Sequence, residues 1–335
     1  MEIRHCPGLL TEGYPGYSPL FMRRMFAGRK VSHILPYNAP EIDEADQKIF
    51  MQNRKRISIS GMQEKYSALL EKNSLRLTIE NEQGSYILKP KPHGLRKNAM
   101  APANEHVTMQ IASQVYTIPT AVNGLVFFSN NEPAYLTKRF DIDINEAKLS
   151  IEDFASLAGK TEENAGSNFR YEYSYEGIAE LIKTYVGAWK IEMEKFFNLV
   201  VFNFLFSNGD AHLKNFSLLE TANGDYVLSP AYDLMDTRIH VDEDGFFALS
   251  DELFKEWYWS DCRIKNPQHH PCKEDFIVFG NKIGIAENRV SKLLMPFLKK
   301  QVDVENLVKK SFLDEDTKVQ YLIHYNQRLE MLNLG

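Results

Sequence analysis

A carboxylate, an amide and a second carboxylate follow one another at short spacing in the second half of the chain. Asp210 and Asn215 lie within residues 208–217, and Asp233 lies within residues 229–234. An aspartate can orient or deprotonate a hydroxyl, and Mg²⁺ prefers hard oxygen ligands such as amide and carboxylate oxygens. The pattern therefore predicts phosphoryl transfer from a magnesium nucleotide, with Asp210 acting on the acceptor and Asn215 with Asp233 holding the metal.

The residues between the amide and the second carboxylate predict a hairpin. Two apolar runs, Phe216 to Leu219 and Tyr226 to Leu228, flank the turn signal Asn223-Gly224-Asp225. Such a hairpin would return the chain and place the two metal ligands side by side. The alternative is that Asn-Gly-Asp is an ordinary turn in a solvated acidic loop. A preceding apolar run, Phe196 to Phe206, favours a site at the end of a buried helix.

Two features of the first half would suit the phosphates of a nucleotide. Residues 56–70 predict a strand, a tight loop and a strand, and backbone amides near Ser60 and Gly61 could cradle phosphate oxygens. Lys89 ends an apolar strand and could reach the α- and β-phosphates. The alternatives are an ordinary hairpin and an edge-strand lysine with its head in water.

Several segments, taken in their order along the chain, resemble one family, the HipA-like serine/threonine kinases. These kinases are the toxin halves of bacterial toxin–antitoxin operons. The resemblance covers about residues 55 to 240. The matching segments are Ser58 to Lys65, Tyr86 to Pro90, Asn104-Glu105-His106, Lys138 to Asp141, Glu152-Asp153-Phe154, Asn208 to Ser217 and Ser229 to Asp233.

The resemblance implies ATP and Mg²⁺ as cofactors and assigns a role to most of the matching residues. It implies Asp210 as the catalytic aspartate, Asn215 and Asp233 as metal ligands, and Lys89 as the phosphate lysine. The remaining residues assigned to the nucleotide side are Ser60 and Gly61 in the phosphate loop, Lys138, Arg139 and Phe140 in the adenine hinge, His212 as an orienting group, and Lys214.

The phosphate loop also carries an implied regulatory site. Ser58 matches the family's autophosphorylated serine, and Ser60 departs from the family pattern by adding a second hydroxyl. A phosphoserine brings about −1.5 to −2 charges into a loop that faces the phosphates of ATP. We therefore expect inhibitory autophosphorylation on Ser58, Ser60 or both.

Fold class follows from a change of pattern along the chain. Short alternating runs in residues 56–137 surround one helical segment, Ala101 to Val115, whereas the chain from about residue 150 is mainly helical. We predict an α+β, two-lobed protein-kinase-like fold, with a sheet-rich N-lobe in residues 1–141 and a helical C-lobe in residues 142–335. Residues 171–175 are expected to form the most mobile loop. The helices predicted in the C-lobe are residues 152–158, 175–186, 190–206, 273–283, 287–298 and 317–333.

Composition narrows the location and the direct partners. The 335 residues carry a net charge of −6, so DNA contact is expected only through a partner. There is no apolar stretch long enough to span a membrane and no signal-peptide core near Met1. Three cysteines fit a reducing compartment. We expect a cytoplasmic protein.

The combined prediction is a toxin kinase that phosphorylates a translation component, an aminoacyl-tRNA synthetase by the resemblance. The implied partner is a DNA-binding helix-turn-helix antitoxin. About fifty residues precede the phosphate loop, where family members carry a further subdomain, so a small co-encoded protein is expected to replace it. The alternatives are a small-molecule phosphotransferase of the aminoglycoside or choline kinase type, and a nucleotide-binding pseudokinase that acts as co-repressor.

Overall fold

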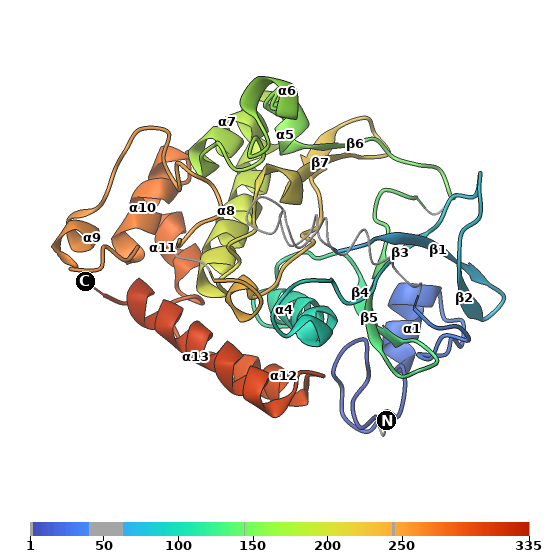
Figure 1. The fold of residues 1–335 in the computed structure, drawn as a ribbon. Helices are drawn as coiled ribbons and strands as arrows, with labels where there is room; N and C mark the ends of the chain where they lie inside the picture. Colours follow the sequence, from blue (N-terminus) through green and yellow to red (C-terminus); the bar gives the residue numbers. More distant parts are fainter. Residues whose placement is uncertain (1–2, 40–62, 144, 243–244, 335) are drawn as a thin grey trace.

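The computed structural model describes residues 3–39, 63–143, 145–242 and 245–334. Ser58, Ser60 and Gly61 lie outside these residues. The chain forms a sheet-rich part and a helical part with helix α4, Ala101–Gln114, between them (Figure 1). This arrangement confirms the predicted α+β, two-lobed kinase-like fold.

The sheet-rich part is built on five antiparallel strands in the order β2-β1-β3-β5-β4. Strands β4 and β5 are buried on both faces, and helix α4 contacts both of them. Turns at Lys72-Asn73 and Asn130-Asn131 connect neighbouring strands. The strands are β1 Tyr66–Glu71, β2 Ser74–Leu77, β3 Tyr86–Lys89, β4 Asn123–Phe127 and β5 Pro133–Lys138.

The first residues of the chain complete this part instead of forming a core of their own. Helix α1, Pro19–Phe26, follows an N-cap at Ser18, and its Phe21 is fully buried. A Cβ atom on Gly124 of β4 would lie 2.5 Å from the Phe21 ring, so only glycine allows this close packing. The backbone of Leu35 donates to Phe127 O at 2.7 Å. The segment is thereby tied to the sheet at two places.

The helical part surrounds the long apolar helix α8, Trp189–Leu205, as its sequence predicted. A three-stranded sheet, β6-β7-β8, lies beside it and contains the predicted hairpin. Its strands are β6 Ile151–Asp153, β7 Ser217–Glu220 and β8 Tyr226–Leu228. The other helices are α5 Phe154–Leu157, α6 Glu162–Ala165, α7 Tyr175–Tyr185, α9 Asp261–Lys265, α10 Lys273–Lys282, α11 Glu287–Leu294, α12 Val302–Lys310 and α13 Glu315–Leu332.

The prediction of one helix over residues 152–158 is wrong at its start. Glu152 and Asp153 belong to strand β6, and the helix begins only at Phe154. The Asp153 side chain accepts a hydrogen bond from Ser156 N at 2.9 Å, so this residue both ends the strand and caps the helix. Pairing of β6 with β7 is a non-local contact that periodicity in the sequence does not reveal.

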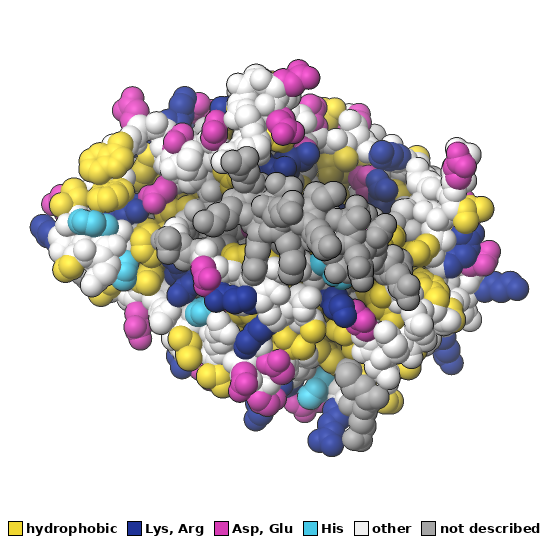
Figure 2. Space-filling model, viewed as in Figure 1, with side chains coloured by type: hydrophobic (Ala, Val, Ile, Leu, Met, Phe, Trp, Pro, Cys, Tyr) yellow, Lys and Arg dark blue, Asp and Glu magenta, His cyan; other side chains and the backbone are white. Residues whose placement is uncertain are grey.

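The described surface is mixed in charge. Acidic and basic side chains alternate over the described part of the face shown in Figure 2. None of the helices in the described ranges has the length and apolar character needed to cross a bilayer.

Phe202 in α8 provides a test of the helical core. Its fully buried ring stacks on Phe206 at a centroid distance of 4.4 Å. We expect Phe202→Ala to lower the free energy of unfolding by about 3–5 kcal/mol, because it leaves a cavity in a packed core. Ile191→Ala, on the same helix but 63% exposed, should change it by less than about 0.5 kcal/mol. Chemical denaturation measures both, and equal losses would contradict this packing.

Candidate active site

A cavity of about 490 Å³ opens between the sheet and the helical part. Its walls come from β3, from the segment that follows β5, and from the two polar segments that the sequence singled out. The predicted site residues that line it are Lys89, Lys138, Arg139, Phe140, His212, Lys214, Asn215 and Asp233. The fold therefore gathers most of the predicted nucleotide and metal residues around one space.

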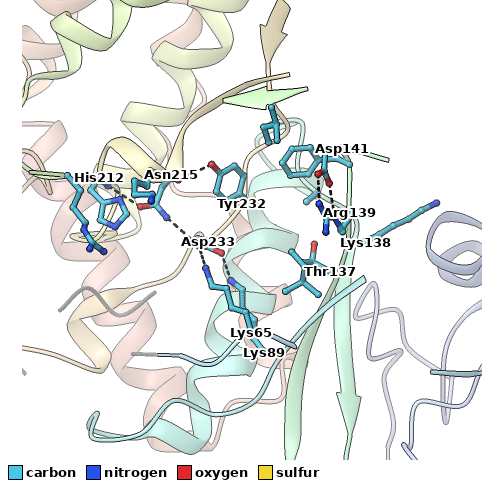
Figure 3. A pocket seen from close by; sticks show the side chains of 16 residues that line it. Lys65, Lys89, Thr137, Lys138, Arg139, Asp141, His212, Asn215, Tyr232 and Asp233 are labelled. Carbon is cyan, nitrogen blue, oxygen red and sulfur yellow. Dashed lines mark hydrogen bonds and ion pairs between the residues drawn. The ribbon is translucent and has the colours of Figure 1, made fainter. Parts of the chain in front are cut away.

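At the base of the cavity a buried lysine lies between two carboxylates. Lys89, at the end of β3, places its Nζ 2.7 Å from Glu105 Oε1 and also contacts Asp233 Oδ1. Lys65 approaches the other carboxylate oxygen of Asp233 at 3.5 Å. Figure 3 shows both lysines pointing toward Asp233. The cluster thus joins strand β3, the residue before β1, helix α4 and the segment that carries Asp233.

Burial and charge act in opposite directions on this cluster. Burial alone would lower the pKa of Lys89, but the carboxylates of Asp233 and Glu105 raise it above its ordinary value, so the lysine stays a cation. Burial raises the pKa of Glu105 to about 7, against the lowering effect of Lys89. A cation held in this way can exchange one carboxylate for a phosphate oxygen.

Asp233 has an unusual backbone conformation for a residue other than glycine. Its φ is +55°, in the left-handed region that aspartate tolerates better than most residues. Neighbouring contacts hold this conformation: Ala231 N donates to Pro119 O at 2.8 Å, and Asp236 N donates to Asn104 Oδ1 at 3.1 Å. The carboxylate is therefore directed into the cavity by a fixed backbone.

The hairpin β7-β8 brings the two predicted metal ligands together. Asn215 Nδ2 lies 3.4 Å from Asp233 Oδ2, although 18 residues separate them in the sequence. The amide oxygen of Asn215 accepts a hydrogen bond from His212 N at 3.2 Å. These two side chains offer the hard oxygen atoms that Mg²⁺ prefers, so the donor set fits the metal. Bound there, magnesium would neutralise charge on the nucleotide phosphates.

His212 lies in the cavity wall as a neutral ring. Burial, and next the Arg170 cation, lower the pKa of His212 to about 3. Its Nε2 lies 3.9 Å from Asp210 Oδ1. Its backbone N–H donates to the amide oxygen of Asn215, and the orienting role stays a prediction.

Asp210 lies beside the cavity rather than among its lining residues, next to His212. A hydrogen bond fixes the turn that carries Asp210, since Gly209 N donates to Thr237 Oγ1 at 2.8 Å. The Asp210 carboxylate accepts a hydrogen bond from Tyr171 at 2.6 Å. An acceptor hydroxyl approaching the end of the cavity could therefore reach this carboxylate.

The predicted hinge forms the wall opposite the hairpin. Lys138 N and Arg139 N bond to Val122 O and Ser85 O at 2.8 and 2.9 Å, which fixes the backbone. The Phe140 ring lies 5.7 Å from the Tyr232 ring, centroid to centroid, and together they give an apolar surface. In Figure 3 the Lys138 side chain extends away from the cavity. Backbone and aromatic groups, more than the Lys138 ammonium, would contact a base.

Sequence reasoning gave no role to two residues that touch the centre of the site. Glu105 lies in one of the segments that match the family, on a helix that follows the strand of Lys89. Because kinases pair a strand lysine with a helix glutamate, this position could have indicated Glu105 as the partner of Lys89. Tyr171 was placed only in the loop expected to move. Its contact with Asp210 spans 39 residues of sequence, and no local pattern indicates it.

Comparison with known proteins identifies the family. Residues 57–304 match the family described as the HipA-like C-terminal domain, which is well over half of the chain. The chain belongs to the HipA-like family. The predicted resemblance is thus confirmed.

Relatives support the prediction of a kinase. A Haemophilus influenzae protein named "Putative kinase" is 27% identical over 336 residues, covering 97% of this HipA-like chain and 94% of that protein. A Sinorhizobium fredii protein of the same description is 31% identical over 227 residues, covering 64% of this chain and 53% of its own length.

Solved structures show the same fold. The toxin–antitoxin complex of Shewanella oneidensis HipA, HipB and operator DNA contains a chain that matches with a TM-score of 0.61 at 20% identity, covering 88% of this chain and 72% of its own. The Helicobacter pylori proinflammatory kinase CtkA matches with a TM-score of 0.50 at 15% identity, covering 79% and 93%.

Removal of Lys89 should separate its electrostatic role from its part in the chemistry. We expect Lys89→Met to lower the free energy of unfolding by about 3 kcal/mol, because Glu105 loses its buried partner. The loss should be larger at pH 8 than at pH 6. Burial raises the pKa of Glu105 and Lys89 lowers it, so in the variant the folded state keeps this proton to a higher pH than in wild type. Unfolding releases the proton, and the variant therefore loses stability over a pH range in which the wild type no longer does.

The double variant Lys89→Met/Glu105→Gln is the matched control. A neutral amide needs no cation, so most of the stability should return, while phosphoryl transfer should stay at least about 100-fold below wild type. Denaturant titrations at the two pH values and an ATP-dependent labelling assay measure these effects. Recovery of activity together with stability would contradict a direct role for Lys89.

Proposed function

We propose that this chain is an ATP- and Mg²⁺-dependent serine/threonine protein kinase that acts as the toxin of a bacterial toxin–antitoxin system. One observation carries the proposal. Lys89 lies between Glu105 and Asp233, with Asn215 beside Asp233, in a cavity that ends next to Asp210. This is the set of groups that phosphoryl transfer from a nucleotide requires.

The geometry suggests how the groups divide the work. The base would lie against Phe140 and Tyr232, and Lys89 would move from Asp233 onto the phosphates. Asn215 and Asp233 would hold the metal ion, which supplies charge neutralisation. Asp210 would take the proton of the acceptor hydroxyl. The oxygen of that hydroxyl would bond to the γ-phosphorus while the bond from this phosphorus to the ADP leaving group breaks.

The acceptor and the partners are inferred from the family. We propose an aminoacyl-tRNA synthetase as substrate and a helix-turn-helix antitoxin as partner. The similar Shewanella chain was solved with HipB and operator DNA, which supports an antitoxin partner. A net charge of −6 supports DNA contact through the antitoxin. The small co-encoded protein and the cytoplasmic location stay predictions.

A labelling experiment tests the function directly. The purified chain is mixed with γ-labelled ATP, Mg²⁺ and a host-cell extract, and labelled proteins are identified by mass spectrometry. We expect phosphoserine or phosphothreonine on a synthetase. Label only on small molecules would favour the phosphotransferase alternative, and nucleotide binding without any transfer would favour the pseudokinase.

Asp210 and Asp233 should both be required for transfer. We expect Asp210→Asn and Asp233→Asn to lower the rate of labelling by at least about 100-fold, because they remove the base and a metal charge. Asp225→Asn is the control, since this residue lies exposed in the turn of the same hairpin. Growth inhibition in the host should follow the labelling rates, and a fully active Asp210→Asn variant would exclude the proposed mechanism.

The proposed self-regulation concerns Ser58 and Ser60, which lie outside the described residues. Mass spectrometry of active protein should find phosphate on one or both, and none on the Asp210→Asn variant expressed alone. Aspartate at both positions should weaken ATP binding, because added negative charge repels the nucleotide phosphates. Calorimetry that shows unchanged ATP affinity in this double variant would contradict the regulation but not the kinase.

A further inference from the structure

The Tyr171 side chain contacts the proposed catalytic carboxylate directly. Its hydroxyl donates to Asp210 Oδ1 at 2.6 Å. A phenol O–H is a hydrogen-bond donor at neutral pH, and a carboxylate is a strong acceptor for it. The contact is therefore a charge-assisted hydrogen bond aimed at the group that would receive the acceptor proton.

The backbone around Tyr171 is anchored on both sides, although its segment was expected to be the most mobile loop. Leu213 N, in the catalytic segment, donates to Arg170 O at 3.0 Å. Ser250, which is distant from Tyr171 in the sequence, donates its backbone N–H to Tyr171 O at 2.9 Å. The Tyr171 ring also meets His212 edge to face, with centroids 5.0 Å apart. The hydroxyl is consequently held in place by backbone and ring contacts that do not involve Asp210.

A second tyrosine in the same segment contacts the same turn in a different way. Tyr175 OH donates to the backbone oxygen of Ala211 at 3.1 Å. It fixes the main chain next to Asp210 but does not touch the carboxylate. The two tyrosines therefore separate support of the turn from orientation of the reacting group.

We propose that Tyr171 is a positioning residue for Asp210. Its hydroxyl holds Oδ1 and thereby fixes the rotation of the carboxylate that receives the acceptor proton. General-base transfer depends on such alignment, because a misplaced group loses about 100-fold in rate. The inference rests on the proposed function, and it assigns Tyr171 to the acceptor side of the site.

A competing interpretation is that the phenol occupies the place of the acceptor hydroxyl and blocks it. The two interpretations predict opposite signs for one variant. Loss of the hydroxyl slows transfer if Tyr171 positions Asp210, and it speeds transfer if Tyr171 blocks the site. The anchored backbone favours positioning, because a blocking group must move aside in every turnover.

The test compares Tyr171→Phe and Tyr175→Phe with wild type. The readouts are the initial rate of γ-phosphate transfer, to the acceptor labelled in host extract and to water, over a range of ATP concentrations, together with the thermal unfolding midpoint. We expect Tyr171→Phe to lower kcat by about 10- to 100-fold, with KM for ATP within about twofold and an unchanged midpoint. Tyr175→Phe should keep kcat within about threefold, even if it lowers the midpoint.

Each other outcome would overturn the positioning role. A wild-type or raised kcat in Tyr171→Phe would contradict it, as would equal losses of kcat in the two variants, which would indicate general support of the turn. Asp210→Asn is measured alongside. If that variant stays active, the proposed function fails, whereas an inactive Asp210→Asn with a fully active Tyr171→Phe overturns only the role of Tyr171.

Discussion

The site depends on the charge balance around one buried cation. Lys89 is only 4% exposed, and a lone ammonium group at such a position would be very costly. Glu105 and Asp233 compensate it, and in doing so they connect strand β3, helix α4 and the segment after the hairpin. The interaction that makes the lysine tolerable in the fold is thus the same one that assembles the floor of the cavity. A phosphate group could replace Asp233 at the lysine and release that carboxylate for a metal.

Helix α4 also contacts the segment that follows Asp233, and this segment contacts the last helix of the chain. Asn104, next to Glu105 on α4, donates to Asp236 O at 2.8 Å and accepts from Asp236 N at 3.1 Å. The Asp236 carboxylate in turn contacts His324 Nδ1 of helix α13 at 2.7 Å. Helix α13 thus supplies a buried partner to a residue three positions after Asp233, and it supports that segment.

Local signals in the sequence were sufficient where neighbouring residues decide the structure. The hairpin after Asn215 was predictable because Asn-Gly-Asp favours a tight turn between short apolar runs, and it places Asn215 and Asp233, the two proposed metal ligands, side by side. The partner of Lys89 and the hydroxyl at Asp210 were not assigned, because Glu105 and Tyr171 reach them through packing of distant elements. Family resemblance supplied roles for single residues, but the contacts that orient those residues required the fold.

A crystal structure with Mg²⁺ and a non-hydrolysable ATP analogue would show whether this cluster binds the nucleotide. We expect the triphosphate in the cavity, with Lys89 Nζ bonded to phosphate oxygens and the metal bound by the Asn215 amide oxygen and the Asp233 carboxylate. Glu105 should keep its contact with Lys89. A nucleotide bound elsewhere, or a metal ion held without Asp233, would contradict the assignment of this cluster as the phosphate and metal site.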